Sequence, residues 1–295
     1  MSLLGRLGVW TWVDMLPAPQ AAAFAKDVEG WGYSALWLPE AVGRDPFVTI
    51  AYLGAHTQRL AFATGIANLY ARDAMTMKAL AQTTGEVTGG RFALGIGVSH
   101  AHLVTNVRGH EYGKPVATMR SYLEAMDKAL YRAVGPPAPV PVILAALRPK
   151  MLALAAERAQ GAHPYFVTPE HTARAREILG KDRLLAPEQK VLLCTDPAKA
   201  RAVARANMAI YTGLPNYQNN LKWLGFEDAD FAGGGSDRLV DAIVAWGDED
   251  AIRRRVQEHF DAGADHVCIQ PLNPDGQPVP HRETLELLAP AKGGW

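Results

Sequence analysis

Short apolar runs rich in β-branched and aromatic residues alternate along the chain with longer segments of helical periodicity. Strands separated by helices are typical of a parallel sheet with crossover helices. The apolar runs predict eight strands, over residues 6–12, 33–40, 60–69, 91–99, 141–147, 161–167, 190–194 and 266–272. The helical pattern covers residues 19–31, 45–57, 74–88, 115–133, 148–160, 169–180, 196–211, 237–246, 248–262 and 281–289.

The predicted strands are apolar at nearly every position, as expected where both faces of a sheet are covered. A closed TIM (β/α)8 barrel and an open doubly wound sheet both fit this alternation. The count of eight and the absence of a long linker favour the barrel, so we expect one α/β domain over residues 1–295. Residues 212–236 are polar and Gly-rich but contain Trp223, Phe226 and Phe231. These aromatic side chains can be buried, so the segment is predicted to be an insertion rather than a linker. Residues 100–114 are expected to be irregular.

Composition and charge exclude several functional classes. The chain has 30 basic and 30 acidic side chains, so it lacks the basic surplus that nucleic-acid binding requires. We find no apolar run of about 18 residues and no signal-peptide pattern, so we expect no membrane span and a cytoplasmic protein. Cys194 and Cys268 are both expected to be reduced, buried thiols.

The chemistry of a parallel barrel is located where its strands end. These ends carry polar and aromatic side chains with little net charge, which suits a flat, conjugated, hydrogen-bonding ligand. They include Trp12, Asp14, Glu40, Gly65, Ile66, Asn68, Tyr70, Gly97, Ser99, His100, His102, Leu147, Arg148, Lys150, His163, Tyr165 and Gln270.

The segment LRPKM places Arg148 and Lys150 at the start of a helix that follows a strand. The free N–H groups and the positive dipole end of a helix N-terminus favour phosphate. Ordinary solvated charge is the alternative interpretation of these two cations. Glu40, which ends the segment LWLPE, has the corresponding alternative of a surface carboxylate.

Two motifs near residue 99 suggest other activities. GIGVSH resembles a dinucleotide fingerprint, but His100 replaces its third glycine and no helix is predicted to follow. GVSHA resembles a nucleophile elbow with Ala101 in the last place, so a serine hydrolase using Ser99 is an alternative of another class.

The sequence argues against a metal site and against Schiff-base chemistry. His100 and His102 are spaced to face the same side of a strand, but carboxylate ligands are missing nearby, so we expect no metal. The predicted strands contain no interior lysine, because Lys190 falls at the beginning of its strand. This argues against an aldolase that depends on a lysine.

Several segments in order, LWLPE, TGIANLYARDA, RFALGIGVSH, PVILAALRPKMLALAAERAQGA and AGADHVCIQPL, resemble the bacterial luciferase-like family over essentially the whole chain. They are most similar to the branch that uses the deazaflavin coenzyme F420. The resemblance implies a TIM barrel that holds F420, or alternatively FMN, at its C-terminal mouth. It also implies a lid at 212–236, a homodimer, and a non-prolyl cis peptide bond, here Gly65–Ile66, that supports the ring system.

The resemblance also implies roles for single residues. Gly65, Ile66, Gly97, Val98 and Ser99 would border the ring, while Ala146, Leu147 and Lys150 would meet the phosphate. Glu40, Asn68 and His100 are the candidate catalytic residues. Relatives often carry His after the acid of the second strand, whereas this chain has Ala41, so the role of proton donor is left open.

The function expected from this resemblance is hydride transfer between F420 and a small organic substrate. Three alternatives remain: an FMN-dependent monooxygenase, the hydrolase based on Ser99, and a barrel that has lost its cofactor and serves as a binding protein.

Overall fold

The computed structural model describes residues 3–293 and 295. Its strands form one continuous sheet in the order β10-β9-β11-β1-β2-β3-β5-β6-β7-β8, and the short β4 pairs with β5. All of these pairs are parallel. The strands are β1 (Leu7–Trp10), β2 (Ala35–Leu38), β3 (Ala61–Thr64), β4 (Ala67–Asn68), β5 (Phe92–Gly97), β6 (Val142–Leu144), β7 (Gly161–Ala162), β8 (Leu184–Leu185), β9 (Glu188–Leu193), β10 (Val244–Gly247) and β11 (Val267–Pro271).

The two ends of the sheet meet because β8 continues into β9 across Ala186 and Pro187. The N–H of Ala186 donates to the carbonyl of Ala162 at 2.9 Å, on the β7 side. The carbonyl of Pro187 accepts the N–H of Cys268 at 3.1 Å, on the β11 side. The sheet therefore closes on itself, which confirms the predicted TIM barrel and excludes the open doubly wound sheet.

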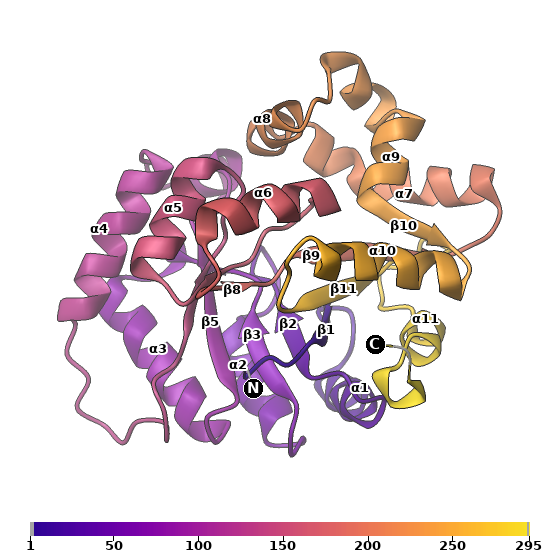
Figure 1. The fold of residues 1–295 in the computed structure, drawn as a ribbon. Helices are drawn as coiled ribbons and strands as arrows, with labels where there is room; N and C mark the ends of the chain where they lie inside the picture. The colour runs from indigo at the N-terminus through magenta and orange to yellow at the C-terminus, as the bar shows by residue number, and fades with distance from the viewer. Residues whose placement is uncertain (1–2, 294) are drawn as a thin grey trace.

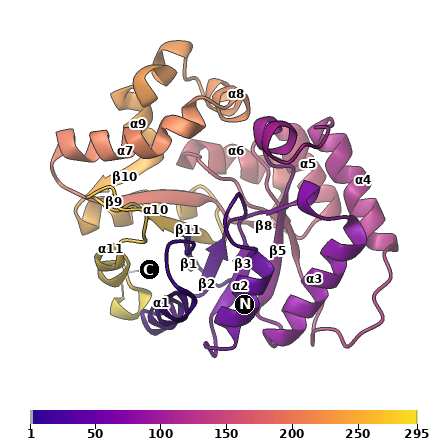
Figure 2. The same cartoon turned by 180° about the vertical axis from the view of Figure 1, so that it is seen from behind.

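Helices α1 to α6 surround the strands, whereas α7, α8 and α9 lie together at one end (Figures 1 and 2). Several begin at an aspartate whose side chain accepts the first free N–H groups, for example Asp45, Asp73 and Asp196. None of the helices in residues 3–293 is long and apolar enough to cross a membrane. The helices are α1 (Ala18–Gly30), α2 (Pro46–Gly54), α3 (Ala74–Val87), α4 (Pro115–Lys128), α5 (Pro149–Arg158), α6 (Pro169–Leu179), α7 (Pro197–Thr212), α8 (Pro215–Trp223), α9 (Asp237–Ile243), α10 (Glu249–Asp261) and α11 (Arg282–Leu287).

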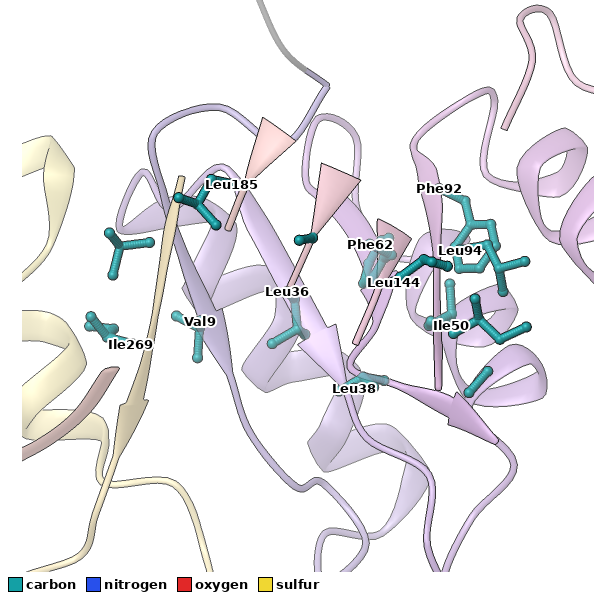
Figure 3. Close-up of a cluster of buried hydrophobic side chains, with 14 of the residues drawn as sticks. Val9, Leu36, Leu38, Ile50, Phe62, Phe92, Leu94, Leu144, Leu185 and Ile269 are labelled. Carbon is teal, nitrogen blue, oxygen red and sulfur yellow. The ribbon is translucent and has the colours of Figure 1, made fainter. Parts of the chain in front are cut away.

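Alternate residues of each strand build two separate cores. Leu36 and Leu38 of β2 and Phe62 of β3 belong to the outer core, where the sheet packs against helices (Figure 3). The residues between them, such as Ala35 and Trp37, belong to a different cluster inside the barrel. Both faces of the strands are buried, as their continuous apolar character predicts.

The barrel interior combines many small residues with a few large rings. Trp10 and Trp37 fill space that is left by alanines on the neighbouring strands. The Trp37 ring stacks on His163 at 4.4 Å between centroids, and its Nε1–H donates to Nε2 of His266 at 3.0 Å. The barrel interior around Trp10 and Trp37 is thus a packed core rather than a pore.

Three sequence expectations require correction. Residues 237–246 are not one helix: the chain leaves α9 at Ile243 and forms β10, which pairs with the C-terminal half of β9. Residues 100–114 contain a π-helical segment, Leu103–Val107. Cys268 is buried, but Cys194 is only partly buried, because it follows the last residue of β9.

Candidate functional site

A bulge interrupts the third barrel strand at the C-terminal mouth. The chain leaves β3 at Thr64, turns at Gly65 and Ile66, and rejoins the sheet as β4. The Gly65–Ile66 peptide bond is cis, as the resemblance predicts. Gly65 is held from both sides: its N–H donates to the carbonyl of Leu38 at 2.8 Å, and its carbonyl accepts Nε1–H of Trp10 at 2.9 Å.

Two glycines allow the bulge to pack closely against its neighbours. A Cβ atom on Gly65 would lie 2.5 Å from Nε1 of Trp10. A Cβ atom on Gly97 would lie 2.7 Å from Cδ1 of Ile66. Both distances are far below van der Waals contact, so a side chain at either position would displace the bulge. Ile66 remains partly exposed above Gly97.

Glu40 is fixed in an ion pair rather than free in the mouth. Its carboxylate accepts two hydrogen bonds from the guanidinium of Arg72, both at 2.7 Å, and its side chain is only 7% exposed. It also accepts the backbone N–H of Asn68 at 2.7 Å. Arg72 additionally contacts Asp45 at 2.7 Å. Sequence reasoning missed Arg72, which clamps Glu40 against β4.

Asn68 presents an unpaired amide donor beside the bulge. Its side chain is fully buried, and Oδ1 accepts the N–H of Tyr70 at 2.9 Å. Its Nδ2 is buried without a hydrogen-bond partner. An unsatisfied buried donor costs roughly 1–3 kcal/mol. A carbonyl oxygen or ring nitrogen of a heterocycle would satisfy this donor, so the residues at the bulge fit a flavin-like ring.

The end of β5 borders the same region. Val98 and Ser99 are partly exposed, and the φ angle of Ser99 is 58°, in the left-handed region. The carbonyl of Ser99 accepts the hydroxyl of Tyr112 at 3.2 Å. Among the described residues no hydrogen bond links the Ser99 hydroxyl to a histidine, so the geometry offers no base to activate it as a nucleophile.

His100 and His102 separate instead of converging. His100 lies beside Asn216 of the 212–236 segment, and its ring lies 5.6 Å from that of Tyr217. Nδ1 of His102 lies 2.8 Å from Nδ2 of Asn106, a different partner. Burial lowers the pKa of His100, so its imidazole is neutral at neutral pH.

The loop between β6 and α5 supplies the predicted phosphate residues. Ala146 is buried, Leu147 is partly exposed, and Lys150 is exposed in the first turn of α5, whose initial N–H groups have no helical partner. Nε2 of His171 lies 2.6 Å from the carbonyl of Leu147. Burial lowers the pKa of His171 to about 4, so the neutral ring donates to this carbonyl and fixes the loop.

A buried polar network inside the mouth was not predicted from the sequence. Lys190 is fully buried within β9, so its assignment to the beginning of a strand is wrong. Its ammonium donates to Tyr165 Oη and Gln270 Oε1, each at 2.8 Å, and to Glu188 Oε1 at 3.3 Å. Three acceptors match the three protons of an ammonium group.

This network also removes one argument against Schiff-base chemistry, because an interior lysine is present after all. The ammonium of Lys190 is, however, engaged by three partners. Burial lowers the pKa of Lys190 and raises that of Glu188, and the mutual attraction of the two charges opposes both shifts. The two charged residues stand two positions apart on one strand, and this spacing was the available sequence signal.

Aromatic side chains connect the network with the bulge and with the insertion. The Tyr165 ring lies 4.9 Å from Trp10, and its hydroxyl oxygen lies 2.8 Å from that of Tyr211. In the 212–236 insertion, Tyr217 packs beside His100, and Trp223 meets His171 edge-on at 5.8 Å. The insertion therefore contacts residues that follow both β5 and β7.

Comparison with known proteins places this geometry in a family. The pattern of the luciferase-like monooxygenase family matches residues 2–266. A Mycobacterium tuberculosis protein named as a coenzyme F420-dependent oxidoreductase is 27% identical over 255 residues, which cover 72% of this chain and 73% of that protein.

Two solved structures share the fold. The F420-dependent tetrahydromethanopterin reductase from Methanopyrus kandleri superposes with a TM-score of 0.77 at 17% identity, covering 97% of both chains. The FMN complex of a type II Baeyer-Villiger monooxygenase from Pseudomonas putida has a TM-score of 0.72 at 15% identity, covering 97% and 96%. The chain therefore belongs to the luciferase-like monooxygenase family of oxidoreductases.

Proposed function

We propose that this protein transfers a hydride between coenzyme F420 and a small organic substrate. The observation that carries the proposal is the Gly65–Ile66 bulge with the unpaired Nδ2 of Asn68 beside it, because together they form a support with a free hydrogen-bond donor for a flat heterocycle. The name of the Mycobacterium tuberculosis relative, a coenzyme F420-dependent oxidoreductase, supports the choice of cofactor.

The remaining cofactor residues follow from their positions around the mouth. Gly65, Ile66, Gly97, Val98 and Ser99 would border the ring. Ala146, Leu147 and Lys150 would receive the phosphate, because the first turn of α5 offers free N–H groups and one cation. Bound F420 would supply the carbon that carries the hydride, and the protein would orient that carbon toward the substrate.

The three candidate catalytic residues take different roles in this proposal. Asn68 would contact the ring directly. Glu40 would be a positioning residue that acts through Asn68, since its carboxylate is engaged by Arg72. His100 would face the substrate as a neutral imidazole that can accept a proton, beneath the 212–236 segment, which would exclude water as a lid.

Fluorescence titration of the purified protein with F420 and, separately, with FMN tests the proposal. We expect F420 to bind in the micromolar range and FMN to bind at least tenfold more weakly. The FMN complex of the Pseudomonas putida structure supports a second candidate function, an FMN-dependent monooxygenase. Tight binding of FMN alone would establish that alternative, and binding of neither cofactor would overturn both.

The homodimer and the cytoplasmic location that follow from the resemblance and the composition stay predictions. Light scattering of the purified protein would test the first.

A further inference from the structure

Helix α8, Pro215–Trp223, has one face that contacts residues following the barrel strands β5 and β7. Asn216 on that face is a neighbour of His100, and Trp223 meets His171 edge-on. Asn220 is four residues after Asn216 and three before Trp223, so it lies on the same face between these two contacts.

The two contacts show what lies beneath Asn220. His100 follows the end of β5, which borders the proposed ring site. His171 binds the carbonyl of Leu147 in the proposed phosphate loop. Arg174 donates to the carbonyl of Trp223 at 2.6 Å and anchors this end of the helix. Along α8, Asn220 therefore lies between the contact to His100 and the contact to His171, and we infer that it faces the interval between the proposed ring and phosphate sites.

The amide of Asn220 is completely buried, yet neither of its polar atoms has a partner. Its exposed fraction is 0%, and both Oδ1 and Nδ2 are without a hydrogen bond. A buried amide that forms no hydrogen bond opposes folding, and a leucine of similar volume would avoid this penalty. A group that supplies both a donor and an acceptor would satisfy the two atoms together.

We propose that Asn220 binds the hydroxylated ribityl chain that links the ring of F420 to its phosphate. This inference rests on the proposed function, since it requires the ring at the bulge and the phosphate at α5. A chain joining these two sites must cross the interval under Asn220. Each ribityl hydroxyl both donates and accepts a hydrogen bond, as the free Nδ2 and Oδ1 require. FMN carries the same ribityl chain, so the contact does not depend on which ring is bound.

The test compares Asn220→Leu with Asn219→Leu, in which the neighbouring exposed amide is replaced. Each variant is titrated by fluorescence with F420 and with the same deazaflavin ring carrying a methyl group in place of the ribityl chain. For Asn220→Leu we expect F420 affinity to fall about tenfold or more, the loss typical of hydrogen bonds to a buried amide. We expect its affinity for the methyl analogue to match that of the wild type. Asn219→Leu should bind both ligands as the wild type does.

Unchanged F420 affinity in Asn220→Leu would overturn the inference and leave the proposed function intact. An equal loss with both ligands would assign the amide to the ring and also overturn it. Failure of the wild-type protein to bind F420 or FMN would overturn the proposed function first, and this inference with it.

Thermal unfolding without ligand supplies the second readout. We expect Asn220→Leu and the smaller Asn220→Ala to unfold no more than a few degrees below the wild type, because no protein hydrogen bond is lost. We also expect a smaller rise in Tm with F420 than in the wild type. A large drop in Tm for both ligand-free variants would show a structural role for the amide and would overturn the proposal.

Discussion

The indole of Trp10 on β1 donates its Nε1–H to the carbonyl of Gly65 across the barrel interior, at 2.9 Å. Gly65 follows β3, which is not a neighbour of β1 in the sheet, because β2 lies between them. The same indole packs against Tyr165, whose hydroxyl accepts from Lys190. One side chain thus links the bulge at the proposed ring site to the buried polar network.

Replacing Gly65 with valine should abolish cofactor binding at the bulge. Its Cβ would lie 2.5 Å from Nε1 of Trp10, so the hydrogen bond cannot persist in its present geometry. Overpacking of this kind costs about 1–3 kcal/mol of folding stability. Urea denaturation and F420 titration measure the two effects. Gly30→Ala is the control, since nothing lies within 4 Å of a Cβ atom there. Full binding by the Gly65 variant would contradict the assignment of the bulge to the ring.

Replacing Lys150 with alanine should weaken cofactor binding while leaving stability unchanged. A charge-assisted hydrogen bond to phosphate contributes about 1–3 kcal/mol, and added salt should reduce the difference. Isothermal titration at low and high ionic strength would measure it. Lys128→Ala is the matched control, because Lys128 is exposed at the opposite end of another helix. Equal affinities for Lys150→Ala and the wild type would remove Lys150 from the phosphate site.

Removing either partner of the Lys190–Glu188 ion pair should lower the free energy of unfolding. Removing both partners should lower it by less than the sum of the two single losses. Lys190→Met leaves Glu188 buried without its cation, and removal of one partner of a buried pair costs about 3–5 kcal/mol. Glu188→Gln alone leaves the opposite charge uncompensated. Urea denaturation of both single variants and the double variant gives the coupling free energy. Strictly additive losses would mean that the two charges do not interact.

Stability should decrease as the pH falls from about 6.5 toward 4. Burial lowers the pKa of His163, His171 and His266 to about 4 each and that of His259 to about 3. In the unfolded chain these pKa values are near 6.5, so the unfolded state binds more protons between the two values and is favoured there. Near pH 4, the decrease in the free energy of unfolding approaches about 3 kcal/mol for each of these histidines.

Urea denaturation at several pH values between 7 and 4 tests this dependence. His163→Phe retains a ring to stack on Trp37, so its stability should vary less steeply with pH than that of the wild type. His110→Phe, at an exposed position, should leave the slope unchanged. A wild-type stability that is flat across this range would contradict the burial of neutral imidazoles.

The sequence alone predicted the elements that depend on local chemistry. Continuous apolar runs predicted the barrel strands apart from β8 and the first two residues of β9, and the pair Asp45-Pro46 marked the start of α2. The resemblance located the cis peptide bond at Gly65–Ile66. Periodicity assigned residues 244–246, most of β10, to a helix, because three residues at the end of a helical pattern do not reveal the free edge of β9 that they join.

Tertiary structure alone decided which polar groups meet in the mouth. The charge on Lys190 is visible in the sequence, but its position inside the barrel depends on β9 beginning at Glu188 and on closure of the sheet around it. Arg72 reaches Glu40 across 32 positions of the chain, and His171 reaches Leu147 across 24. Local periodicity determines which segments form strands and helices. Contacts between residues so far apart in the sequence depend on the closed barrel, because only closure brings the strand ends together.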